Sequence, residues 1–152
     1  MKSEHLKLDQ TDHRIILELK QNCRRSYREL ASRTGMSPAA LIERIKRLEQ
    51  QGVITGYSAN FDFLKLGYEF MAVVQISISG DLLKTQERIS RLNGVAAVYD
   101  MTGHYDSLAI VMCMSRSELS ALLKKILGVE GVEKTSTDMV LNVVKKLAEF
   151  AP

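Results

Sequence analysis

The sequence has no tryptophan, few cysteines and no long apolar run. Cys23 and Cys113 are its two cysteines, and neither has a second Cys or a His at metal-ligand spacing, so free thiols and no metal site are expected. No apolar stretch approaches the roughly 20 residues that span a bilayer. The N-terminus also lacks the apolar core of a signal peptide. We therefore expect a cytoplasmic protein without a membrane segment.

Charge is distributed unevenly along the chain. The 152 residues carry a formal net charge of +3, with 26% charged and 45% apolar residues, which is ordinary for a globular protein. Residues 1–60 hold 11 Lys and Arg against 7 Asp and Glu, whereas residues 61–152 hold 10 against 11. The small positive excess lies in the first half, where a phosphate-binding module would need it, and it is supporting evidence only.

The stretch 26–52 contains two helix starts with a glycine between them. Ser26, followed by Glu29 three residues later, forms a capping-box pattern. Gly35 can end that helix in the left-handed conformation, and Ser37 with Pro38 begins the next one. Asp9 can cap an earlier helix, with Asp12 in its first turn near the positive end of the helix dipole. The first half is thus predicted to hold three helices: Gln10–Gln21, Tyr27–Thr34 and Pro38–Gln51.

The third of these helices is predicted to be amphipathic. Leu41, Ile45 and Leu48 recur on one face. The opposite face carries mainly small and charged residues: Ala39, Ala40, Glu43, Lys46 and Arg47, with Arg44 on its flank. An apolar back and a basic front, after a short helix and a glycine turn, are typical of helix-turn-helix DNA binding. An ordinary αα-hairpin with a solvated charged face fits this pattern alone about as well.

The second half predicts an α+β unit. Val53–Asp62, rich in β-branched and aromatic residues, is expected to form a strand that links the halves. From Tyr68 the apolar period becomes two, and the order strand, helix, strand, strand, helix, strand follows, with Gly-Val before the second and fourth strands. This order is that of a ferredoxin-like βαββαβ domain with two helices on one face. The predicted division is 1–52 helix-turn-helix domain, 53–67 strand and linker, and 68–152 ferredoxin-like domain.

One face of that sheet would be bare in a monomer. An exposed apolar face usually marks an association surface, so a homodimer built sheet to sheet is expected. The residues expected to line this face are apolar: Met71, Val73, Met139, Leu141 and Val143.

Six segments together resemble the Lrp/AsnC family of transcription regulators. The resemblance implies a winged helix-turn-helix domain joined to a domain that senses a small molecule, usually an amino acid. It also implies homodimers that assemble further, often to octamers, on double-stranded DNA. The matching segments are LDQTDHRII (8–16), SYRELASRTGMSP (26–38), ERIKRLEQQGVITGY (43–57), LG (66–67), TGHYD (102–106) and GVEKTST (131–137).

The resemblance places an effector site at the turn 103–106 and on the last strand. Backbone N–H groups at Gly103 can receive a carboxylate, and Asp106 can pair with an ammonium. By themselves these residues fit a plain hairpin turn better, whereas the resemblance favours a ligand site. The effector-binding residues it implies are Gly103, Tyr105, Asp106, Thr135 and Thr137.

The same resemblance places the DNA contacts on the third helix and before it. Arg44 and Arg47 could reach phosphates or guanine edges. Ala39 and Ala40 stand where family members often have Ser or Thr, which weakens base-specific readout and leaves more to phosphate contacts and DNA shape. The implied contacts are Arg24, Arg25, Arg28, Ser37, Ala39, Ala40, Glu43, Arg44 and Arg47. For each of Arg24, Arg25 and Arg28, a solvated basic face is an equally good interpretation.

Two other functions are compatible with this chain. Siroheme decarboxylases look like the same family, but they tend to carry a His-x-Tyr-Asn-x-Trp pattern where this chain has Gly103-His104-Tyr105-Asp106 and no tryptophan follows. No nucleophile–base pair or metal cluster stands out elsewhere, so neither enzyme activity nor a cofactor is expected. An architectural, nucleoid-associated protein that binds DNA without an effector is the other alternative, and Ala39 and Ala40 keep it open.

Overall fold

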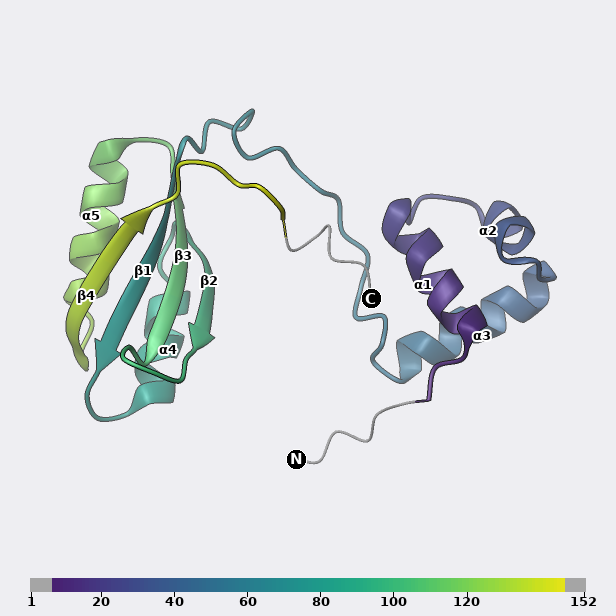
Figure 1. Cartoon of the computed structure of the whole chain (residues 1–152), viewed down its shortest axis with the longest axis horizontal. Helices are drawn as coiled ribbons and strands as arrows, with labels where there is room; N and C mark the ends of the chain where they lie inside the picture. Colours follow the sequence, from purple (N-terminus) through teal and green to yellow (C-terminus); the bar gives the residue numbers. More distant parts are fainter. Residues whose placement is uncertain (1–6, 147–152) are drawn as a thin grey trace. The chain divides into compact units, whose positions relative to one another are not determined.

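The computed structural model of the chain describes residues 7–146 and divides into two compact units (Figure 1). One unit reaches to Asn60, and the other spans Phe61–Val144. The first is helical, and the second consists of a four-stranded sheet with two helices. The predicted α+β architecture, a three-helix unit and a βαββαβ unit, is therefore confirmed.

The helical unit forms around one apolar stripe from each helix. It contains α1 (Gln10–Gln21), α2 (Tyr27–Thr34) and α3 (Pro38–Gln50), which match the predicted helices except that α3 ends one residue earlier. The buried core consists of Ile15, Leu19, Leu30, Ala31, Leu41, Ile45 and Leu48. Because the apolar stripe of α3 is buried in this core, the opposite face of the helix is exposed to solvent.

The helix starts use the capping residues that the sequence indicates, with one difference. Ser26 Oγ accepts the Glu29 N–H, but the Glu29 carboxylate lies 3.4 Å from Arg25 Nε instead of returning to the cap. The capping box predicted at α2 is therefore only half formed. The complete box lies at α1, where the side chains of Asp9 and Asp12 each accept the other's backbone N–H.

The strand predicted at Val53–Asp62 is absent: this segment has no regular secondary structure. The N–H groups of Val53 and Ile54 both bond the Leu48 carbonyl oxygen, and their side chains pack on the helical core. The β-branched residues thus close the end of α3. No described strand pairs with the segment, and a strand needs such a partner for its backbone groups.

The second unit is one antiparallel sheet with helices on one face (Figure 1). Its strand order is β2-β3-β1-β4, so β3 is an inner strand, as its unbroken apolar run predicts. Ala72, Val74 and Ile76 of β1 are buried against the helices. The elements are β1 (Phe70–Ile78), α4 (Leu82–Ser90), β2 (Val95–Asp100), β3 (Ser107–Cys113), α5 (Arg116–Leu127) and β4 (Val132–Met139).

The register corrects part of the predicted bare face. Met139 lies opposite Ala72, a core residue, and so belongs to the helix-covered face. Leu141 and Val143 lie beyond the end of β4. The face without helices carries other apolar side chains as well, because β1 and β3 pair Val73 with Ile110. Its central residues are Met71, Val73, Leu108, Ile110 and Met112, all partly exposed.

The repeated Gly-Val steps have a steric basis. Gly94 and Gly131 both have positive φ, at 93° and 94°, and each carbonyl accepts a backbone N–H, from Met112 and Ser79 respectively. A Cβ on Gly94 would lie 2.9 Å from Leu122 Cδ2, and one on Gly131 would lie 2.5 Å from Thr85 Oγ1. Each glycine therefore lets a helix and a strand meet at closest approach.

Candidate nucleic-acid interface and effector site

The front of α3 presents short side chains near its N-terminus. Ser37, Ala39, Ala40 and Glu43 are all exposed. Ser37 Oγ accepts the Ala40 N–H at 3.3 Å, so its hydroxyl proton stays available to donate to a phosphate. The positive end of the helix dipole lies at this same turn. This part of α3 can approach an anionic backbone closely.

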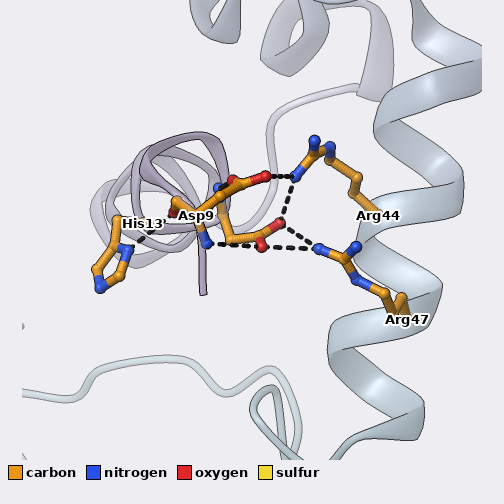
Figure 2. A network of polar contacts seen from close by, with 5 residues as sticks. Asp9, His13, Arg44 and Arg47 are labelled. Carbon is orange, nitrogen blue, oxygen red and sulfur yellow. Dashed lines mark hydrogen bonds and ion pairs between the residues drawn. The ribbon is translucent and has the colours of Figure 1, made fainter. Parts of the chain in front are cut away.

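Arg44 and Arg47 of α3 are held by two carboxylates at the start of α1, those of its N-cap residue Asp9 and of Asp12 (Figure 2). Arg44 Nη1 lies 2.6 Å from Asp9 Oδ2 and 2.8 Å from Asp12 Oδ1. Arg47 Nη2 lies 2.7 Å from each oxygen of Asp12. Neither guanidinium is therefore a free cation, although both were predicted as direct DNA contacts. The Arg44 and Arg47 side chains still expose 28% and 46% of their surface, so a duplex can touch both.

Asp12 is the centre of this four-residue network. Its side chain is only 1% exposed, and its two oxygens receive the bonds from both arginines. The hydrogen bond from Arg44 lowers the pKa of the Asp9 carboxyl, and the bonds to Asp9 and Asp12 raise the pKa of Arg44. Two carboxylates facing two guanidiniums make the cluster electrically neutral, which offsets the cost of burying Asp12.

The basic residues around α2 fall into two groups. Arg25 donates from Nη1 to the backbone and side chain of Glu18 at 2.9 and 2.8 Å, and Glu18 is also paired with Arg33. Arg33 lowers the pKa of Glu18. By contrast, Arg24 and Arg28 are exposed, and their side chains have no partner among residues 7–146. Arg24 and Arg28 are thus freer to meet phosphates than Arg25.

The turn before β3 folds onto the end of β1. The Asp106 N–H donates to Ile76 O at 3.0 Å, and Asp106 Oδ2 accepts the Ile78 N–H at 2.8 Å. The Asp106 carboxylate therefore has a structural partner already. Gly103 has a φ of 133° and open space around it, as a turn that presents its backbone requires.

The residues predicted as the effector site do not all share one face. Tyr105 lies under Lys134 Nζ, 5.6 Å from the ring centroid, and so the turn reaches β4. The register sets Thr135 and Thr137 opposite Ile76 and Val74, whose side chains are buried beneath the helices. Lys134 and Ser136 alternate with them and point to the other face.

The sequence analysis missed Asp9 and Asp12 as parts of the α3 surface, and Lys134 beside the turn. Both aspartates were assigned only to the start of α1. Spacing could not reveal the ion pairs, since the partners lie 32 to 35 residues apart. Lys134 could have been found from strand alternation, which places it on the opposite face of β4 from Thr135, its neighbour in sequence.

Comparison with known proteins identifies both halves. Residues 8–55 match the model for a winged helix-turn-helix DNA-binding domain, and residues 71–150 match the model for the Lrp/AsnC ligand binding domain. The chain belongs to the Lrp/AsnC family. An HTH-type transcriptional regulator from Pyrococcus furiosus is 38% identical over 148 residues, which cover 97% of this chain and 100% of the relative.

Two solved Lrp/AsnC-type structures share the fold over nearly the whole chain. The feast or famine regulatory protein of Mycobacterium tuberculosis, complexed with L-methionine, has a TM-score of 0.88 at 28% identity and covers 96% of this chain and 100% of its own. A transcriptional regulator of Neisseria meningitidis in complex with L-methionine has a TM-score of 0.85 at 25% identity. The match covers 92% of this chain and 94% of the Neisseria chain. The chain is thus a DNA-binding helix-turn-helix transcriptional regulator of this family.

No helix in the described part of the chain, residues 7–146, is long and apolar enough to cross a membrane.

Proposed function

We propose that this Lrp/AsnC regulator binds preferred duplex sequences through α3 and changes its assembly or its DNA binding when it takes up an amino acid. The observation that carries the proposal is the exposed front of α3, which offers a free N-terminal turn and two oriented arginines beside it. Arg24 and Arg28 supply phosphate contacts. We assign it a regulatory role and no enzyme activity.

An amino-acid effector is supported by chemistry and by likeness. Two related structures contain L-methionine. The turn 103–106 offers open backbone at Gly103 for a carboxylate, Asp106 for an ammonium, and Tyr105 with Lys134 at its side. Thr135 and Thr137 keep a place in the proposal on the resemblance alone, since the register turns them toward the helices.

The apolar face of the sheet supports a homodimer. Val73, Leu108, Ile110 and Met112 lie together on the sheet face that none of the described helices covers. Burying such a face against a second copy removes it from water. Assembly of dimers into octamers extends the same proposal.

Footprinting tests the DNA-binding half. A dimer with one recognition helix per subunit should protect half-sites about one helical turn apart, or multiples of that distance. The probe is the duplex that the protein itself enriches from a randomised pool. Uniform protection without periodic sites would instead favour the architectural alternative, in which exposed Ala39 and Ala40 provide no base readout.

A thermal-shift screen of the twenty amino acids tests the sensing half. A ligand that binds the folded state raises the melting temperature by an amount that grows with its concentration relative to its dissociation constant. Asp106→Asn keeps an acceptor for the Ile78 N–H but removes the charge that would pair with an ammonium, so it should lose the shift and stay folded. Asp106→Ala is the poorer variant because it also removes that structural bond. If no amino acid shifts the wild type, the sensing proposal fails.

A further inference from the structure

The ion-pair network between α1 and α3 uses the two arginines in different ways. Arg44 donates to Asp9 and Asp12 from a single nitrogen, Nη1. Its Nε and Nη2 have no partner among residues 7–146, and they point away from both carboxylates in Figure 2. These two nitrogens form one edge of the guanidinium, the edge that grips two acceptors at once.

Arg47 has no such edge to spare. Its Nη2 is bound to both oxygens of Asp12, and Nη2 belongs to each of the two forks that a guanidinium can offer. Arg47 therefore keeps only separate donors, at Nε and Nη1. The geometry suits Arg47 to holding Asp12 in place, and it suits Arg44 to reading an acceptor pair.

Asp12 cannot meet a duplex itself. Its side chain is 1% exposed, and both its oxygens are occupied by arginine nitrogens. Any effect of Asp12 on DNA must therefore act through Arg44 and Arg47. Asp9 is half exposed and touches Arg44 but not Arg47 in the network, so it isolates the contribution of one arginine.

We propose that Asp12, assisted by Asp9, is a positioning residue of the DNA interface: it fixes Arg44 so that the Nε and Nη2 edge is already aimed at a guanine edge or a phosphate. This inference rests on the proposed DNA-binding function of α3. A side chain held in its binding geometry loses little freedom on contact, and only a fixed fork distinguishes a guanine from other bases. The carboxylates thus contribute to sequence preference although they carry the charge that DNA repels.

The test measures binding of the full-length protein to two duplexes: the sequence enriched by the wild type from a randomised pool, and a scrambled duplex of equal length. The variants are Asp12→Asn and Asp9→Asn. Asn can still cap α1, which preserves the helix start. Glu130→Gln is the matched control, because it also removes one negative charge and one ion pair. Glu130 lies in the second unit, where its Oε2 is 2.5 Å from Arg88 Nη1.

The ratio of specific to scrambled affinity should fall roughly tenfold in Asp12→Asn, the size of one lost bidentate base contact, and less in Asp9→Asn. It should not change in Glu130→Gln. Arg44→Lys keeps the charge and lacks the fork, so Asp9→Asn should have no further effect on the ratio in an Arg44→Lys background. The coupling is the difference between the effect of Asp9→Asn on the ratio in the wild type and its effect in Arg44→Lys. If the aspartates had a purely structural role, the substitutions would lower the melting temperature and this coupling would be zero.

The remaining outcomes are decisive in either direction. An unchanged or higher ratio in folded Asp12→Asn and Asp9→Asn overturns the positioning role while leaving the DNA-binding function intact. If Asp12→Asn does not fold, the test rests on Asp9→Asn alone, whose effect on the ratio is then compared between the wild type and Arg44→Lys. If the wild type enriches no sequence, the proposed function fails, and this inference fails with it.

Discussion

At the scale of single residues, the carboxylates paired with arginine set how the fold responds to acid. The hydrogen bond from Arg44 lowers the pKa of Asp9 from its ordinary value of 3.8, and Arg88 lowers that of Glu130 from 4.5. A group with a depressed folded pKa stabilises the protein above its unfolded pKa. That stability is lost as the pH falls through the folded value.

The free energy of unfolding should therefore decline as the pH falls below about 4, and the decline should be shallower in Asp9→Asn, which cannot titrate at that position. Urea unfolding at a series of pH values, followed by circular dichroism, measures both slopes. Identical slopes in the wild type and Asp9→Asn would show that the pair with Arg44 contributes nothing.

Gly131 offers a second residue-scale prediction. An alanine there would place Cβ 2.5 Å from Thr85 Oγ1 at a φ of 94°, so Gly131→Ala should cost about 1–3 kcal/mol. Urea unfolding measures the cost. Thr85→Ala removes the closest of the clashing atoms, so the double variant should lose less stability than the sum of the losses in the two single variants. Strictly additive costs would contradict the close contact.

At the scale of elements, the N-cap of α5 can be tested cleanly. Ser115 Oγ accepts the Glu118 N–H at 3.1 Å, and the Glu118 carboxylate accepts the Met114 N–H at 2.9 Å. Ser115→Ala should cost about 1 kcal/mol of unfolding free energy. Ser120→Ala, at an exposed position inside the same helix, is the control and should be neutral or slightly stabilising. Equal effects of the two substitutions would contradict the cap.

Local signals predicted the helices well because their causes are local. Ser37, Pro38 and Gly35 act within one turn of the backbone, and the stripe of Leu41 and Ile45 repeats within one helix. The strand predicted at 53–62 was wrong, because a strand depends on a pairing partner that no nearby residue specifies.

The candidate site was harder to predict than the fold for a similar reason. The residues of the α3 front could be read from its period, but the partners of Arg44 and Arg47 lie on α1, more than thirty residues away. The role of Asp106 in bonding the Ile78 backbone likewise needs the packing of two strands. Sequence patterns locate such side chains on an element, and tertiary contacts decide what they are free to do.

At the scale of the whole molecule, the apolar sheet face should control association. Val73→Lys places a charge at the centre of that face, opposite Ile110, and should convert the proposed dimer to a monomer because a buried unpaired charge is costly. Sedimentation equilibrium measures the change. Leu83→Lys, on α4 with 72% of the leucine exposed, is the control and should leave the mass unchanged. A dimer that survives Val73→Lys would have to form elsewhere.

The neutral cluster of Asp9, Asp12, Arg44 and Arg47 has a kinetic consequence. A cation whose counter-charge lies within 3 Å in the same chain exerts little pull on a distant polyanion. Diffusional encounter with a duplex is thus governed by those cations of the helical unit that have no partner in the described part of the chain, such as Arg24 and Arg28. The arginines of α3 act only after contact, so they set how long the complex lasts rather than how fast it forms.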